Sequence, residues 1–119
     1  MRHLKLNYVE FPASNISATK RFFETAFAWT FTDYGSDYTA FSDQGLDGGF
    51  YKSELQAKAA TGSALLVLKT DDLEASLETV KSAGGLISTD IFSFPGGRRF
   101  HFIEPSGNEF AVWTLEQSA

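Results

Sequence analysis

Hydrophobic residues follow two different spacings along the first half of the chain. In Leu4–Phe11 they alternate loosely with polar residues, which predicts a strand that Pro12 ends. In Ile16–Trp29 they recur every three or four residues, which predicts a helix capped by Ser14 or Asn15. The apolar stripe of this helix consists of Ile16, Thr19, Phe22, Phe23, Ala26 and Phe27. Three shorter apolar runs then predict strands over Thr30–Tyr34, Tyr38–Ser42 and Gly49–Lys52.

The same order of elements returns in the second half. Ala64–Thr70 is an apolar run that predicts a strand, and Asp71-Asp72 begins a helix that Gly84-Gly85 ends. Within that helix, Leu73, Leu77 and Val80 share a face. Three strands follow, over Leu86–Phe94, Arg98–Ile103 and Glu109–Thr114. The last two are joined by a tight turn at 104–108, where proline, glycine and asparagine suit the backbone angles of a turn.

The two rounds of elements indicate a duplicated unit. The helix starts Asn15 and Asp72 each come seven residues after a matching strand position, Tyr8 and Leu65 respectively. We therefore predict one α+β domain of two βαβββ modules, one at about 1–54 and one at about 63–119, with a linker at about 55–62. Since neither module can bury its sheet alone, we expect the pair to form one curved mixed sheet around a groove.

Composition and charge restrict the partners. The chain has 119 residues and a formal net charge of −5, so clustered basic residues for nucleic acid are lacking and a neutral or cationic ligand is mildly favoured. It has no cysteine, which excludes a disulfide framework, a thiolate nucleophile and a cysteine metal site. An apolar leader and an apolar run of membrane-spanning length are both lacking, so we expect no membrane partner and a cytoplasmic protein.

Three segments together resemble the vicinal oxygen chelate superfamily, the group of glyoxalases, extradiol dioxygenases and bleomycin-resistance proteins. They are VEFPASNISATKRFFETAFAW, TDDLEASLETVKSAGG and PGGRRFHFIEPSGNEFAVW, and they cover nearly the whole chain. The resemblance implies the paired βαβββ fold. For function it implies less, because that scaffold carries isomerases, oxygenases, transferases and proteins that only bind a ligand.

The resemblance also implies where a divalent metal would be held. The superfamily's enzymes usually use His, Gln or Glu at four groove-facing strand positions, which correspond here to Tyr8, Leu65, Ala111 and Gly49. Leucine and alanine offer no donor atom to a metal. We therefore expect no metal and no cofactor. The alternative is an unusual metal site built from His101 with Glu10 or Glu109.

If those positions face the groove, strand parity places other side chains there too, because residues two apart on a strand share a face. The expected ligand-binding residues are Tyr8, Glu10, Tyr51, Lys69, His101 and Trp113. Arg99 and Glu109 share their faces. All of these except Tyr8 and Tyr51 have a structural alternative. The alternatives are His101 as an ordinary strand histidine, Trp113 as a cap on the core, Glu10 and Lys69 as an ion pair, and Arg99, Lys69 and Glu109 as solvated strand ends. Catalytic residues are not assigned.

Three functions remain open at this point. The first is a metal-free protein that holds a small aromatic or cationic organic ligand in its groove, as bleomycin-resistance proteins do. The second is a divergent glyoxalase- or dioxygenase-like enzyme that uses Glu10, His101 or Tyr8 for acid–base chemistry. The third is a ligand-free dimerisation or regulatory module. In each case we expect a homodimer, since unpaired sheet edges need cover.

Overall fold

Two copies of the same unit follow one another in the computed structural model, which describes residues 3–116. The first contains β1 (Tyr8–Ala13), α1 (Ile16–Phe27), β2 (Phe31–Asp33), β3 (Tyr38–Phe41) and β4 (Asp47–Lys52). The second contains β5 (Leu66–Lys69), α2 (Leu73–Ser82), β6 (Leu86–Phe94), β7 (Gly97–Ile103) and β8 (Glu109–Leu115). A short 3-10 turn, η1 (Ala59–Thr61), lies in the connection between them. The predicted pair of βαβββ modules is therefore confirmed.

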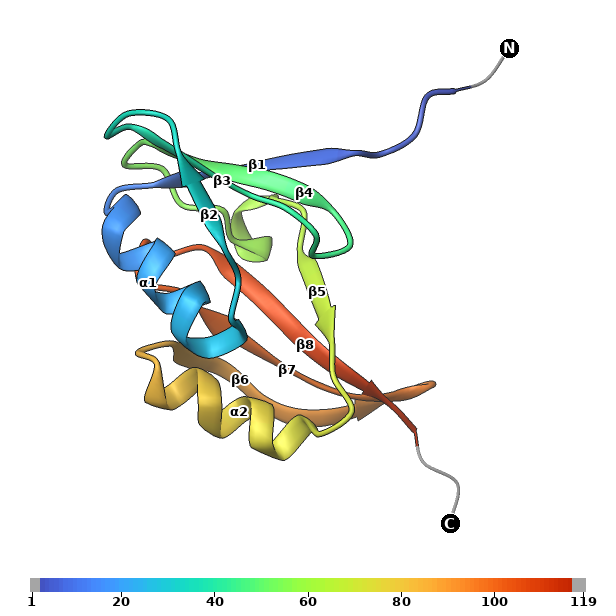
Figure 1. Ribbon diagram of the computed structural model, residues 1–119. Helices are drawn as coiled ribbons and strands as arrows, with labels where there is room; N and C mark the ends of the chain where they lie inside the picture. Colours follow the sequence, from blue (N-terminus) through green and yellow to red (C-terminus); the bar gives the residue numbers. More distant parts are fainter. Residues whose placement is uncertain (1–2, 117–119) are drawn as a thin grey trace.

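Hydrogen bonds divide the curved mixed sheet that the sequence predicted into two mixed four-stranded sheets, one in each module. Their strand orders are β1-β4-β3-β2 and β5-β8-β7-β6. In each sheet the first strand of the module runs parallel to its neighbour and the other pairs are antiparallel. Figure 1 shows the first module (blue to green) above the second (yellow to red), with α1 next to α2.

Local capping explains where the helices begin and end. The Oδ1 atom of Asn15 accepts a hydrogen bond from the Ala18 amide at 3.0 Å, and Asp72 caps α2 in the same way. Helix α1 ends where Ala28 takes a left-handed conformation, two residues before the predicted end. None of the helices among residues 3–116 is long and apolar enough to cross a membrane.

The prediction that Pro12 ends the first strand is wrong. Pro12 lies inside β1, in register with Tyr51 of β4. Among the described strands β1 is paired on one side only, so a residue without an N–H can be accommodated at this edge of the sheet. The predicted start of the strand is also shifted. Residues 3–7 belong to no strand, and the side chains of Leu4 and Leu6 are 98% and 93% exposed.

One aromatic core joins the two modules. Phe23 of α1 packs against Phe50 of β4 and Phe110 of β8, with ring centroids 5.6 and 5.2 Å apart. Phe110 also lies 4.8 Å from Phe11 of β1. The predicted apolar stripe of α1 thus covers the inner faces of both sheets. The opposite face of each sheet is turned away from this core, and these outer faces carry the residues that the sequence assigned to the groove.

A buried polar network holds the β7–β8 turn against the first module. The carboxylate of Glu104 is 2% exposed and accepts hydrogen bonds from Thr19 of α1 (2.6 Å), the Ser106 amide (2.9 Å) and Nδ2 of Asn108 (2.6 Å). Asn108 also donates to the carbonyl of Pro12 at 2.6 Å. Burial raises the pKa of Glu104, while these hydrogen bonds oppose the rise.

Candidate functional site

A row of alternating cationic and aromatic side chains crosses the outer face of the second sheet. Strand register places Lys69 of β5 opposite Trp113 of β8, Trp113 opposite Arg99 of β7, and Arg99 opposite Phe92 of β6. Directly opposite residues have Cβ atoms roughly 5 Å apart, so their side chains are neighbours on the sheet face. We call these four residues the Trp113 row. It extends over all four strands of the sheet.

Contacts within and beside the Trp113 row show how it is packed. The Nζ atom of Lys69 lies 5.5 Å from the centre of the Trp113 ring. The guanidinium carbon of Arg99 lies 5.8 Å from the ring centre of Phe92 and 5.7 Å from that of Phe94. The ring of Phe94 is 6.1 Å from that of Trp113. Both cations therefore rest against aromatic faces, an arrangement that is favourable for charge and ring alike.

A hydrogen-bonded pair lies next to this row. Nδ1 of His101 is 2.9 Å from the carboxylate of Glu109, and Nε2 of His101 is 3.0 Å from a guanidinium nitrogen of Arg99. Because Arg99 can only donate, Nε2 is an acceptor and Nδ1 carries the proton toward Glu109. The His101 hydrogen bond, helped by the Ala59 amide at 2.9 Å, lowers the pKa of Glu109. The result is an ordered chain of arginine, histidine and carboxylate.

The outer face of the first sheet carries a second, smaller group. The hydroxyl of Tyr38 donates to Glu10 at 2.9 Å and lies 2.6 Å from the Tyr8 hydroxyl. The Tyr38 ring lies over Gly49, where an added Cβ would collide with the Tyr38 hydroxyl. Burial chiefly, with the bonds to Tyr8 and Glu10, raises the pKa of Tyr38. Tyr51 is on the same face, in register with Tyr38.

The structure thus places the predicted residues in two groups. Lys69, His101 and Trp113 lie together on the second sheet, and Tyr8, Glu10 and Tyr51 lie on the first. Hydrogen bonds, ion pairs and ring contacts between the two groups are absent from residues 3–116. The alternative ion pair between Glu10 and Lys69 is not formed, because Glu10 bonds to Tyr38 and Lys69 covers Trp113.

Strand parity missed three aromatic residues of these faces. Phe92 and Phe94 are two residues apart on β6, so parity predicts that they share a face. Register shifts in the β6–β7 pairing prevent the sequence from showing which face this is. Tyr38 could have been found by a different feature of the sequence, its pairing with a glycine. Its ring fills the space left by a glycine on the neighbouring strand, and such a pairing is visible only once the register is known.

The donor set does not fit the divalent metal that the superfamily's enzymes use. Among the described residues, His, Asp and Glu do not gather in groups of three or more that could hold an ion. Ala111 is fully buried and lies in register between Val67 and His101. Of these three residues, Ala111 and Val67 have no atom that could bind a metal. Gly49 has no side chain to bind a metal, and the Tyr38 ring occupies the space that a side chain there would need. Within the described part of the chain, the alternative metal site at His101 and Glu109 offers only these two ligands, and Arg99 occupies the free nitrogen of His101.

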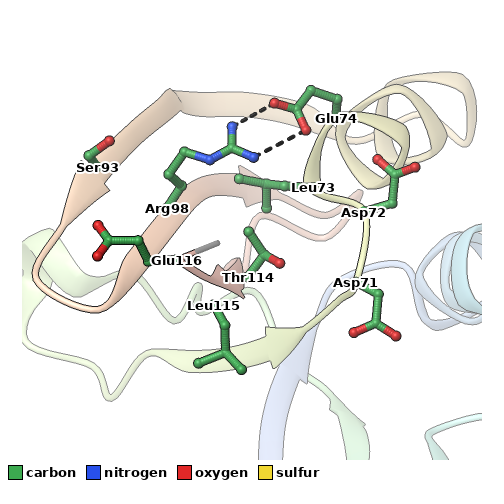
Figure 2. A pocket seen from close by; sticks show the side chains of 9 residues that line it. All are labelled: Asp71, Asp72, Leu73, Glu74, Ser93, Arg98, Thr114, Leu115 and Glu116. Carbon is green, nitrogen blue, oxygen red and sulfur yellow. Dashed lines mark hydrogen bonds and ion pairs between the residues drawn. The ribbon is translucent and has the colours of Figure 1, made fainter. Parts of the chain in front are cut away.

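A cavity of about 500 Å³ lies away from both groups, between the start of α2, the start of β7 and the end of β8. Figure 2 shows Arg98 extending to Glu74, while the carboxylates of Asp71, Asp72 and Glu116 point in different directions. Arg98 lowers the pKa of Glu74 through their hydrogen bonds. Since its basic residue is already paired and its acidic groups diverge, this cavity is a weaker candidate than the Trp113 row.

Comparison with known proteins identifies the class to which this fold belongs. The sequence pattern of the Glyoxalase/Bleomycin resistance protein/Dioxygenase superfamily matches residues 5–112. The chain therefore belongs to this superfamily, as its resemblance to vicinal oxygen chelate proteins predicted. A comparison with curated proteins gives no significant match.

Solved structures show the same fold at low identity. A glyoxalase-related enzyme from Fulvimarina pelagi is 15% identical, with a TM-score of 0.78 over 92% of this chain and 87% of that one. A glyoxalase/bleomycin resistance protein/dioxygenase family enzyme from Burkholderia phytofirmans PsJN is also 15% identical, with a TM-score of 0.77 over 95% and 100%. A protein from the mobile metagenome of V. Pseudocholerae is 25% identical, with a TM-score of 0.70 over 98% of both chains.

Proposed function

We propose that this chain is a small-molecule-binding protein that holds an aromatic organic ligand, without a metal, against the outer face of the β5–β8–β7–β6 sheet. The Trp113 row is the observation that carries the proposal. It sets aromatic and cationic side chains side by side on a sheet face that the shared core does not use. Flat apolar rings with a few polar groups around them suit a small organic molecule.

Of the two ligand types that the sequence suggested, aromatic and cationic, the aromatic one is favoured. A cationic ligand would take the place above an indole or phenyl ring. Lys69 already lies over Trp113, and Arg99 lies against Phe92 and Phe94. An aromatic ligand can stack on Trp113 after the exposed, flexible side chain of Lys69 swings aside.

Acid–base catalysis is the second candidate, favoured by the bond between His101 and Glu109. A carboxylate that holds Nδ1–H leaves Nε2 as the basic nitrogen of the ring. Here that nitrogen accepts from Arg99, so His101 becomes a base only when Arg99 moves. The geometry supports binding more directly than it supports proton transfer.

Trp113 provides the test of the binding proposal. The probe is 2-naphthamide, a neutral two-ring compound, titrated by isothermal calorimetry. We expect saturable binding that Trp113→Ala reduces by about tenfold or more, because stacking on an aromatic side chain contributes about 1 kcal/mol or more beyond the buried area. Tyr34→Ala removes an exposed aromatic residue elsewhere and is the matched control. Equal binding by the wild type and Trp113→Ala would sink the assignment to this face.

We also propose that the chain forms a homodimer. Leu4 and Leu6 support this, because their apolar side chains are almost fully exposed before the edge strand β1 and need cover. Sedimentation equilibrium should give twice the mass of one chain at micromolar concentration, and Leu4→Ser with Leu6→Ser should lower that mass. A single-chain mass at all concentrations would leave the proposal without support.

A further inference from the structure

Within residues 3–116, the outer face of the second sheet carries two positive side chains without an acidic side chain to neutralise them. Arg98, one residue earlier on β7, is paired with Glu74, and Lys20 is paired with Asp33. In contrast, neither Arg99 nor Lys69 has a carboxylate within ion-pair distance among residues 3–116. Two cations therefore lie on either side of Trp113 without an acidic partner.

Glu109, the acidic side chain that accompanies His101 on this face, is already engaged. Its two oxygens accept from Nδ1 of His101 and from the Ala59 amide, each at 2.9 Å. The charge of Lys58 also contributes to the lowered pKa of Glu109, so a further cation lies near this carboxylate. The face thus has more positive than negative groups, although the whole chain carries −5.

Arg99 has hydrogen-bonding capacity to spare. A guanidinium has five N–H donors, and here both donating nitrogens of Arg99 are directed at one acceptor, Nε2 of His101, at 3.2 and 3.0 Å. Its planar fork matches the two oxygens of a carboxylate better than a single ring nitrogen. The rings of Phe92 and Phe94 hold the guanidinium in place and keep part of its surface dry, which strengthens its attraction for an anion.

From this arrangement we infer that the ligand of the Trp113 row is an aromatic acid, whose ring stacks on Trp113 and whose carboxylate is bound by Arg99 and Lys69. This rests on the proposed function, because it names the chemical class of the same ligand. Arg99 and Lys69 flank Trp113 directly in the register of the sheet, so one carboxylate beside a stacked ring can reach either cation. Lys69, released from Trp113 by the incoming ring, keeps its charge close to the carboxylate.

Three matched probes test the charge of the ligand separately from its ring. They are 2-naphthoate, 2-naphthamide and 2-naphthylmethylammonium, which share the two-ring system and carry negative, zero and positive charge. We expect 2-naphthoate to bind about tenfold more tightly than the amide, since a charge-assisted hydrogen bond is roughly twice as strong as a neutral one. The advantage should shrink as salt is added, because partly exposed charges are screened.

Variants at adjacent positions assign the preference to residues. Arg99→Gln and Lys69→Gln should each remove most of the advantage of the acid over the amide. Arg98→Gln deletes the same charge from the opposite face of β7 and should leave the advantage of the acid over the amide unchanged. Thermal unfolding of each variant establishes that the fold is retained.

The outcomes separate the two proposals. Equal affinity for all three probes, with dependence on Trp113, would overturn the aromatic-acid inference and leave the binding proposal in place. Tightest binding of the ammonium probe would also overturn it. Failure of all three probes to bind would overturn both.

Discussion

Replacing Phe110 with alanine is expected to lower the free energy of unfolding by about 3–5 kcal/mol. Phe110 is 1% exposed, and its ring contacts those of Phe11, Phe23 and Phe102 at 4.8, 5.2 and 5.7 Å. It therefore connects both sheets and α1 in one core. The substitution removes the apolar area of a large ring and leaves a cavity between the two modules. This cavity can close only if the modules move relative to each other.

Urea unfolding followed by circular dichroism measures this loss. The control is Phe92→Ala, because Phe92 is 38% exposed on the outer face and should cost less than about 1 kcal/mol. The description of a single core shared by both modules predicts one cooperative transition in the wild type and in both variants. A loss below about 1.5 kcal/mol for Phe110→Ala, or two separate transitions, would contradict it.

Replacing Glu104 with glutamine is expected to cost about 1–3 kcal/mol, although the two side chains have the same shape. One oxygen of Glu104 accepts from the Ser106 amide and the other from Nδ2 of Asn108. The Asn108 amide cannot rotate to adapt, because its own oxygen accepts from the Ala57 amide at 2.8 Å. A glutamine NH₂ therefore faces an N–H donor in either orientation. A protonated carboxyl can instead donate to Thr19 while it accepts on both sides.

The dependence of this difference on pH follows from the raised pKa of Glu104. Since the folded state holds the proton more tightly than the unfolded state, stability from this group falls as pH rises above the ordinary value of 4.5 through the raised pKa. Glutamine does not titrate. The wild type should therefore exceed Glu104→Gln most at acidic pH, and the gap should narrow toward neutral pH.

Unfolding free energies at several pH values, with exposed Glu54→Gln as the control, measure this gap. The lowered pKa values of Asp33 and Glu74 act on the wild type and on both variants alike and cancel in the difference. A gap that widens with rising pH would show that the hydrogen bonds to Glu104 outweigh its burial.

Much of the fold could be predicted because local signals and global packing agree in this chain. The stripe through Phe22 and Phe23, the caps Asn15 and Asp72 and the β7–β8 turn each determine a local structure that the tertiary contacts then reinforce. The error at Pro12 has a physical reason. A proline stops a strand only where its missing N–H would be needed, and the edge position of β1 depends on pairings that are distant in sequence.

The candidate site could be predicted from the sequence only in part. Alternation along each strand placed Lys69, His101 and Trp113 on one face once the family resemblance had implied which strand positions face the groove. Which residues stand opposite one another depends on register between strands, and this determines the Trp113 row and the bond from Tyr38 to Glu10. The net charge of −5 suggested a cationic ligand, yet local pairing leaves this face positive.

The most direct test of the account is to locate a bound aromatic probe by two-dimensional ¹H–¹⁵N NMR of the labelled protein during a titration with 2-naphthoate. We predict saturable shifts at the amides of Lys69, Arg99 and Trp113 and at the indole N–H of Trp113. The chemical shift of the Trp29 indole N–H should not change, because Trp29 is 7% exposed in the core, and this signal serves as the internal control. Shifts confined to the cavity around Asp71 and Arg98 or to the Tyr8–Glu10 face, or their absence at all concentrations, would contradict a ligand site at the Trp113 row.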